Sequence, residues 1–216
     1  MILVVASMKV ELEGLFGLDR SFDHWNECEL KYTGIGRENV AETLNLVDYS
    51  LDREGLLSVG FVGSIDPGVK PGELCLIEAV GSTDKTEMLY PDEELLELAG
   101  RSLNGDYRTC KLLTLNKAAS SPEDKRSLGT EEVSVIDQET FWTAEIAAEN
   151  GIPFLAMRVV VDGVDQALPP ESCYDGDTGE VKPGRFTSWL IHNPTRLSGL
   201  PGLGWNSVKA RRRLGE

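Results

Sequence analysis

Apolar runs and helical segments alternate along this chain, and the alternation restricts the fold more than any other feature of the sequence. Runs rich in Val, Ile and Leu predict buried strands near 1–6, 29–36, 56–64, 73–80, 111–115, 132–137 and 154–162. Segments with helical spacing predict helices near 8–18, 37–51, 91–103, 122–128 and 139–150. Such alternation favours a mostly parallel sheet with helices on both faces. We therefore predict a three-layer α/β/α fold around a central twisted, mostly parallel (mixed) sheet.

The last quarter of the chain carries a weaker pattern. Residues 166–182 are loop-like, and residues 184–215 have helical composition in two pieces that "GLPGLG" separates. No internal repeat or flexible linker divides the 216 residues. One domain over 1–216 is therefore the simplest organisation.

The charge balance excludes several classes of partner. The formal net charge is −15, whereas nucleic-acid grooves need a basic stripe and anionic membrane surfaces attract basic segments. The basic tail "KARRRLGE" is a local exception that suits the C-terminal end of a last helix. No run of 18 apolar residues could cross a membrane. We expect a small-molecule partner, no nucleic acid and no transmembrane segment.

Cysteine and histidine usage predicts neither a metal site nor a bound cofactor. The four cysteines are scattered without a CxxC pair, and the chain has only two histidines. The N-terminal "MILVVA" is too short for the apolar region of a signal peptide. Unpaired thiols without such a peptide suggest a reducing compartment, so we expect a cytoplasmic protein.

Acidic residues follow three of the predicted strands. Glu11 follows the first strand, Glu139 follows "SVID", and Asp162 ends "MRVVVD". Ligands in open α/β sheets bind beyond the carboxyl ends of strands, so the three acids could converge on one site. The alternative is that each acid lies at a helix N-terminus, where the helix dipole favours it. That alternative is the better one for a single acid, whereas three acids together favour a site.

The order of the local patterns resembles the nucleoside phosphorylase and nucleosidase family. The stretches that carry the resemblance are "ILVVASMKVELEGL", "TGIGRENVAETL", "GFVGSIDPGVKPGEL" and "VIDQETFWTAEIAAENGIPFLAMRVVVDGVD". Residues 1–165 are most similar to the branch of methylthioadenosine/S-adenosylhomocysteine nucleosidases. The tail with "DQALPP" looks closer to the hopanoid-associated nucleosidase/phosphorylase group. The resemblance implies the nucleoside phosphorylase-like fold and a homo-oligomer, a dimer or larger.

The resemblance also implies roles for the acids. Glu11 matches the acid of a Met-x-x-Glu motif and would be the general base that activates water. Glu139 would hold the ribose hydroxyls, after Asp137 and after Gln138, which replaces the methionine common in relatives. Asp162 would protonate or hydrogen-bond the leaving purine, and such acid catalysis contributes about 10²–10⁴ in rate.

The glycine-rich segment at 60–64 departs from the family pattern. Phe61 and Gly63 would lie in the base and phosphate pocket, but Phe61 replaces a serine that touches phosphate in phosphorylases. Ser58 stands where phosphorylases carry an arginine for phosphate. The segment "TLNKAASS" lacks the aromatic residue that relatives often place against the base.

Three functions remain open from the sequence. The first is hydrolysis of an adenosyl compound, methylthioadenosine/S-adenosylhomocysteine-like or adenosylhopane-like, with release of adenine. The second is a nucleoside phosphorylase whose phosphate site uses other residues, such as Arg37. The third is a nucleoside-binding protein without turnover.

Overall fold

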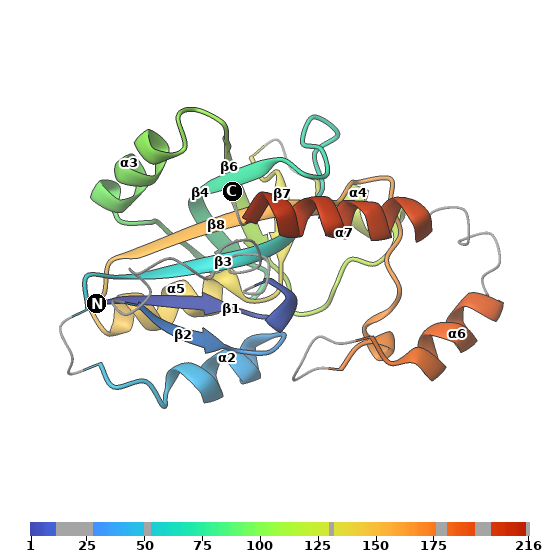
Figure 1. Cartoon of the computed structure of the whole chain (residues 1–216), viewed down its shortest axis with the longest axis horizontal. Coiled ribbons are helices and arrows are strands. Elements are labelled where there is room, and N and C mark those ends of the chain that lie inside the picture. The colour runs from blue at the N-terminus through green and yellow to red at the C-terminus, as the bar shows by residue number, and fades with distance from the viewer. Residues whose placement is uncertain (12–27, 50–52, 130–131, 176–180, 193–199, 215–216) are drawn as a thin grey trace.

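The computed structural model describes residues 1–11, 28–49, 53–129, 132–175, 181–192 and 200–214 (Figure 1). The helix predicted over 8–18 begins in the described part, where residues 9–11 are helical, and its remainder lies outside the described residues.

Eight strands form one mixed sheet, and the predicted α/β class is confirmed. The strands are β1 (Ile2–Ala6), β2 (Cys28–Tyr32), β3 (Gly55–Ser64), β4 (Leu74–Ser82), β5 (Lys85–Leu89), β6 (Arg108–Thr114), β7 (Val135–Asp137) and β8 (Phe154–Asp162). Their order is β2-β1-β3-β7-β6-β4-β5, and β8 pairs with both β3 and β4. The sequence pattern predicted all of them except β5, whose residues "KTEML" carry two charges and little apolar surface.

Five strands close into a ring within this sheet. Strand β8 runs parallel to β3 and antiparallel to β4, β6 runs parallel to β4 and β7, and β7 runs antiparallel to β3. The sheet is therefore not a simple open one. The antiparallel pairing of β3 with β7 joins Gly63 to Ile136, and it brings the ends of the two strands together.

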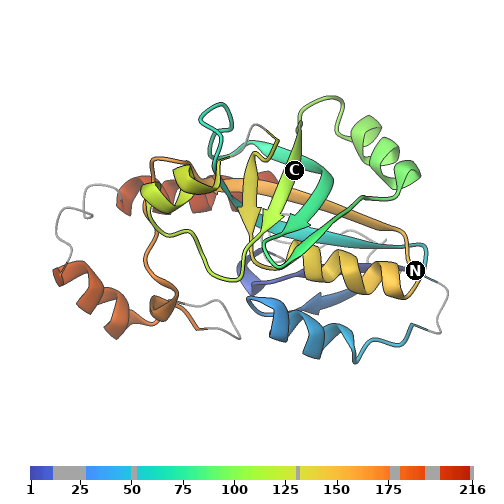
Figure 2. The same ribbon diagram turned by 180° about the vertical axis from the view of Figure 1, so that it is seen from behind.

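Helices cover both faces of the sheet. Helix α5 (Thr140–Glu149) lies on one face beside α2 (Arg37–Leu44), and α7 (Leu200–Leu214) crosses β8 and β3 on the other (Figures 1 and 2). Helices α3 (Glu93–Ser102), α4 (Pro122–Leu128) and α6 (Pro183–His192) lie around the edges. None of the described helices combines the length and apolar composition that a membrane crossing requires.

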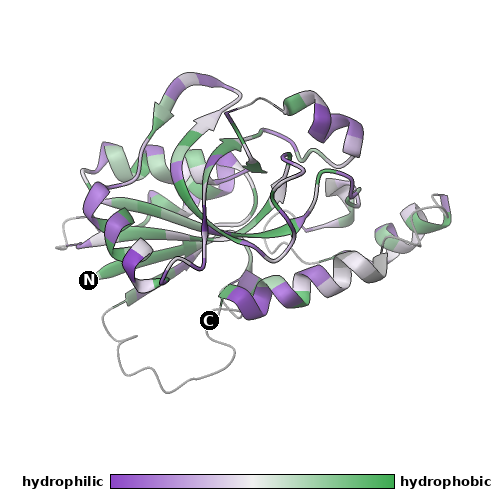
Figure 3. Ribbon diagram, turned by 90° about the horizontal axis from the view of Figure 1, so that it is seen from above, coloured by the Kyte–Doolittle hydropathy of each residue, from purple (hydrophilic) through white to green (hydrophobic). Residues whose placement is uncertain are grey.

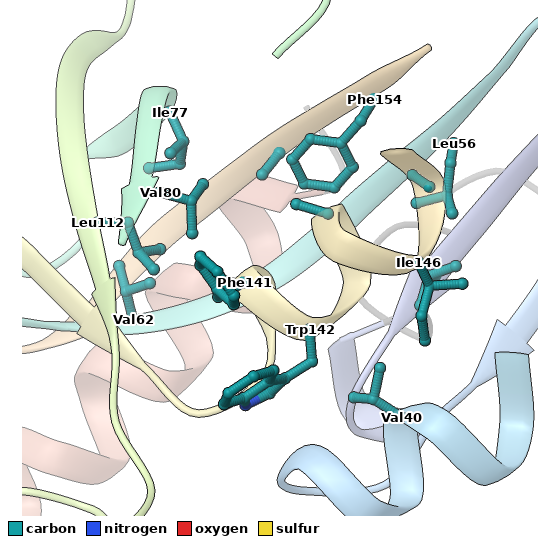
Figure 4. Close-up of a cluster of buried hydrophobic side chains, with 14 of the residues drawn as sticks. Val40, Leu56, Val62, Ile77, Val80, Leu112, Phe141, Trp142, Ile146 and Phe154 are labelled. Carbon is teal, nitrogen blue, oxygen red and sulfur yellow. The ribbon is translucent and has the colours of Figure 1, made fainter. Parts of the chain in front are cut away.

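The main core fills the space between α5 and the strands. Most of α5 is buried because the helix packs against both the sheet and α2. The Phe141 ring lies among Val62, Val80 and Leu112, and it meets the Trp142 ring edge-on with centroids 5.2 Å apart (Figure 4). Hydropathy follows the same layering, with apolar strands inside and polar residues on the outer helices (Figure 3).

The C-terminal helix differs from the prediction at its start. The segment "GLPGLG" was expected to separate two helices, but α7 begins inside it, at Leu200. A proline in the first turn is compatible with a helix because the amide it lacks has no partner there. Ala210 and Leu214 of α7 pack against Leu74 and Val159 of the sheet.

A buried arginine of β8 contacts side chains from β3, β7 and α5. Arg158 of β8 is 2% exposed, and its guanidinium donates to the Oγ of Ser58 (2.7 Å) and the Oγ1 of Thr140 (2.6 Å). Its Nε lies 3.5 Å from Oδ2 of Asp137, whose side chain is equally buried. A buried ion pair of this kind depends on both partners, because either charge alone would lack compensation.

We predict that Arg158→Met lowers the free energy of unfolding by about 3–5 kcal/mol, because it leaves the Asp137 carboxylate buried without its cation. Urea unfolding measures the loss. The control is Arg101→Met, which breaks an exposed pair with Glu97 on α3 and should change stability by about 0.5 kcal/mol or less. A loss for Arg158→Met no larger than that of the control would contradict the role of the network.

Candidate active site

All seven residues predicted from the sequence to form a site line one cavity of about 170 Å³. They are Glu11, Phe61, Gly63, Asp137, Gln138, Glu139 and Asp162. The residues come from the segment after β1, from β3, from the β7–α5 connection and from β8. The predicted convergence of acids from three parts of the sequence is therefore present in the fold.

Glu11 is held by main-chain donors. It is 2% exposed, and its carboxylate accepts from the Phe61 amide (2.7 Å) and the Met8 amide (2.8 Å). A Cβ atom at Gly60 would lie 2.6 Å from Oε1 of Glu11, so only glycine leaves room for this carboxylate beside β3. Burial raises the pKa of Glu11 to about 7, although these hydrogen bonds and the charge of Arg158 oppose the rise.

Asp162 is the last residue of β8 and lies next to Gly63 of β3. A register shift after Val62 pairs Asp162 with Gly63, and a Cβ atom at Gly63 would lie 3.0 Å from Oδ2 of Asp162. The bulge and the glycine together direct this carboxylate into the cavity. Asp162 is 1% exposed, and burial raises its pKa above the ordinary value while Lys125 opposes the rise.

Lys125 is a cavity residue that the sequence reasoning missed. Helix α4 carries it, and the helix begins with a capping box between Ser121 and Asp124. The side chain is 0% exposed, and its ammonium group is ion-paired with Asp162. The local sequence "SPEDKRSL" is highly charged and is typical of a solvated helix. The available signal was its spacing three residues before Leu128, which places both on one helix face.

Asp137 and Glu139 differ in what their carboxylates contact. Asp137 accepts from Thr114 Oγ1 (2.8 Å) and from the side chain and amide of Thr140, and it also faces Arg158. Asp137 therefore caps the start of α5, a helix-terminus role that the sequence left open for Glu139 and not for Asp137. Glu139 instead reaches the Gly36 amide (2.9 Å) and makes no cap hydrogen bond to α5. Burial raises the pKa of Glu139 to about 8, and the neighbouring Asp137 charge adds to the rise.

Phe61 lies within strand β3, not in a turn. Its amide holds Glu11, while its side chain packs with the cluster that includes Ala210 and Leu214 of α7. The remaining cavity wall is largely aliphatic and includes Ile35, Leu115, Ala118, Ala119, Ile136, Val161 and Leu168. The segment without an aromatic residue thus supplies a wall of small apolar side chains.

Two of the positions weighed for phosphate binding, Ser58 and Arg37, do not line the cavity. Ser58 is buried and accepts from Arg158, and Arg37 stacks on the Trp142 ring, 4.4 Å from its centroid. Among the described residues, Lys125 is the one lysine or arginine in the cavity wall. Its ammonium group already serves Asp162, the Gly163 carbonyl and the Gln166 carbonyl.

A larger, open cavity of about 580 Å³ lies between α3 and strands β4 and β6. Its charged lining residues are Glu78, Glu97 and Arg101, and Glu97 and Arg101 are paired with each other. It contains no converging buried acids. Within the described part of the chain, no group of three or more His, Cys, Asp or Glu side chains is arranged to hold a metal.

A protein-family model described as "Phosphorylase superfamily" matches residues 27–180, which is more than half of the chain. The chain belongs to this superfamily. The match covers strands β2 to β8 and includes Glu139 and Asp162, whereas Glu11 lies before it. A search of curated proteins found no match.

Solved structures of nucleosidases share the fold of this superfamily member. Native futalosine hydrolase of Helicobacter pylori is 15% identical, with a TM-score of 0.69, and the alignment covers 99% of this chain and 94% of that one. A mutant methylthioadenosine/S-adenosylhomocysteine nucleosidase of the same organism, with 5′-methylthioadenosine in its active site, is 14% identical (TM-score 0.68; 99% and 95% covered). The Neisseria meningitidis nucleosidase with methylthio-immucillin-A is 16% identical (TM-score 0.65; 99% and 97% covered).

The raised pKa values of Glu11 and Glu139 predict a pH dependence of stability. The folded state holds these protons up to about pH 7 and 8, whereas the unfolded chain releases them near 4.5. Their stabilising contribution is therefore complete below pH 4.5 and is lost as the pH rises through 7 to 8. Each group can contribute a slope of at most about 1.4 kcal/mol per pH unit.

Chemical denaturation between pH 4.5 and 8.5 measures this slope. Glu11→Gln and Glu139→Gln should each flatten the fall in unfolding free energy relative to the unsubstituted protein. Glu97→Gln, at an exposed position on α3, is the control and should leave the slope unchanged. An unchanged slope in both site variants would show that these carboxylates are ionised throughout the range.

Proposed function

We propose that this superfamily member is a purine nucleosidase that hydrolyses the N-glycosidic bond of an adenosyl compound and releases adenine. One observation carries the proposal: Glu11, Glu139 and Asp162 line a single cavity whose one described cation is already paired. In this proposal, Glu11 acts as the base and Asp162 as the acid on opposite sides of the bond that breaks. The described cavity wall supplies no free positive charge for a second anionic substrate.

The proposed reaction breaks the bond between C1′ of the ribose and N9 of the purine. The water oxygen bonds to C1′, and Glu11 takes a proton from that water. Asp162 gives a proton to the leaving base, whose negative charge is thereby neutralised. Positive charge that develops on the ribose ring is stabilised by nearby carboxylates, as glycosidases do with paired acids. Different environments give the two acids the different proton affinities that these roles require.

Binding of the sugar is assigned to Glu139, with Gln138 beside it. Glu139 lies at the cavity wall and keeps acceptor capacity beyond its contact with the Gly36 amide. Asp137, whose acceptors are used internally, positions the β7–α5 connection that carries Glu139. Gly63 gives space to Asp162, and Phe61 contributes its amide to Glu11.

An aminopurine suits the base side of the cavity. The aliphatic wall can pack on the faces of a flat ring, and the Asp162 oxygen that does not carry the transferred proton accepts from an exocyclic amine. The three N–H groups of the Lys125 ammonium donate to three protein acceptors. Lys125 therefore has no free donor for the 6-oxo group of an oxopurine. The structural neighbours that bind 5′-methylthioadenosine or methylthio-immucillin-A support an adenosyl substrate.

We expect base release in phosphate-free buffer, with free sugar as the second product. Purified protein is incubated with 5′-methylthioadenosine, S-adenosylhomocysteine and adenosine, with and without phosphate, and the products are identified by mass. Asp162→Asn should lower turnover by about 10² or more. Asp165→Asn, an exposed position three residues later, is the matched control.

Two outcomes would overturn the hydrolytic proposal. Strict phosphate dependence with ribose 1-phosphate as product would establish the phosphorylase alternative. Binding of nucleosides without any base release would establish the non-catalytic alternative. Because Asp162→Asn leaves Lys125 buried without an anion, the double variant Lys125→Met with Asp162→Asn is measured alongside it, and thermal unfolding verifies that both fold.

We predict that Glu139→Gln reduces activity on ribonucleosides far more than on 2′-deoxyribonucleosides. At about pH 9, above its pKa of about 8, Glu139 is ionised, and a hydrogen bond to a charged acceptor contributes about 1.5–3 kcal/mol, roughly a ten- to hundredfold effect. Only the ribonucleoside has the hydroxyl that makes this bond, so the assays are run at that pH. Values of kcat/KM on adenosine and 2′-deoxyadenosine measure the difference. Glu149→Gln, at the exposed end of α5, is the control. Equal losses on both substrates would assign Glu139 a structural role.

Three further expectations stay predictions for this chain. They are its organisation as one domain over 1–216, its cytoplasmic location and its assembly as a homo-oligomer. Size-exclusion chromatography with light scattering tests the assembly directly.

A further inference from the structure

Lys125 has an environment that a solvent-facing lysine never has. Its side chain is 0% exposed, and its ammonium group donates to the Asp162 carboxylate, the Gly163 carbonyl and the Gln166 carbonyl, the last two at 2.9 Å each. All three acceptors lie in the chain that leaves β8. One side chain from α4 therefore fixes both a carboxylate and the backbone that follows it.

The backbone after β8 is also held by hydrogen bonds of the Gln166 side chain. The Gln166 side chain accepts from the Gly163 amide (2.8 Å) and from the Asn206 amide group of α7 (3.2 Å). Lys125 completes this turn from the cavity side. Its ammonium group meets only Oδ2 of Asp162, which leaves Oδ1 without a contact to Lys125.

We propose that Lys125 is a positioning residue that holds Asp162 in one orientation and weakens the hold of its carboxyl group on the proton that it passes to the base. The inference rests on the proposed function, in which Asp162 passes a proton to the leaving base. A buried carboxylate without a cation would bind its proton tightly and would release it slowly. The ammonium group opposes that effect, so Asp162 can lose its proton to the base within one turnover.

Other titratable groups near Asp162 come from several elements. Glu11 and Glu139 line the same cavity from the segment after β1 and from the start of α5. Tyr174 lies after the short 3₁₀ helix Glu171–Cys173, and burial together with the nearby Asp162 charge raises the pKa of Tyr174 to about 12. Each of these groups is neutral or negative, so among the described residues Lys125 is the positive group in contact with Asp162.

Removal of the charge has a predictable sign. Without Lys125, burial acts on Asp162 unopposed, and its pKa rises further. An opposite charge at contact distance changes a carboxyl pKa by about 1–3 units. One limb of the pH–kcat/KM profile is assigned to Asp162 because it is absent in Asp162→Asn. In Lys125→Met, this limb should move at least about one unit to higher pH. The plateau of kcat should fall about tenfold or more, because a carboxyl group that holds its proton more tightly is a weaker acid.

A second variant separates charge from hydrogen bonding. Lys125→Gln removes the charge but keeps donors for the Gly163 and Gln166 carbonyls. Both variants should move the Asp162 limb of the pH profile to higher pH. The loss of kcat should be smaller in Lys125→Gln than in Lys125→Met. The matched control is Arg126→Met, which breaks the exposed contact of the next residue with Asp165 in the same loop and should move neither the limb nor kcat. Unmoved limbs in both Lys125 variants would overturn the proposal.

A titration without substrate separates this inference from the proposed function. The ¹³Cγ resonance of Asp162 is assigned by its loss in Asp162→Asn and followed with pH in the unsubstituted protein and in Lys125→Met. We expect the midpoint to rise by at least about one unit. An unchanged midpoint overturns the role of Lys125 even if the protein releases adenine. A raised midpoint in a protein that cleaves no nucleoside supports the electrostatic role of Lys125 and refutes its catalytic purpose.

Discussion

Desolvation of carboxylates is the constraint on which the rest of this structure depends. Burying a carboxylate costs free energy unless hydrogen-bond donors or a cation compensate its charge. The carboxylates of this cavity are compensated by different groups. Asp137 is paired with Arg158 and hydrogen-bonded by two threonines, Asp162 is paired with Lys125, and Glu11 accepts from main-chain amides and feels the charge of Arg158. These partners come from β3, β6, β8, α4, α5 and the segment after β1. The placement of those elements is therefore tied to the placement of the acids.

The differences in compensation also give the acids different chemistry. Main-chain amides offset the burial of Glu11 only in part, so its pKa rises to about 7, where a carboxylate can exchange protons with water near neutrality. Asp162 faces a full positive charge, and Glu139 faces the negative charge of Asp137. Groups that share one cavity but differ in their neighbours can take separate acid and base roles.

Hydrophobic periodicity predicted most of the fold, and the acids that follow the strands predicted which carboxylates share one cavity. The bounds of α4 were predicted at 122–128, because a serine cap and Pro122 mark its start. The closure of β3 with β7 could not be read from the sequence, since it depends on pairing between residues far apart in the chain. Lys125 was missed because its neighbours are charged. Arg158 was missed within "FLAMRVVVD", although an unpaired arginine would be costly in a buried strand.

Phe61 differs from the residue of the family pattern, and the difference concerns both packing and hydrogen bonding at one position of β3. In the phosphorylases that the sequence resembles, a serine at this place touches phosphate. Here the side chain packs in the cluster of Ala210 and Leu214, so its contribution to the cavity is the amide that holds Glu11. A phenylalanine cannot offer phosphate a hydroxyl, but it can bury apolar area beneath α7. Residue 61 therefore contributes apolar packing under the C-terminal helix through its side chain and a hydrogen bond to Glu11 through its amide.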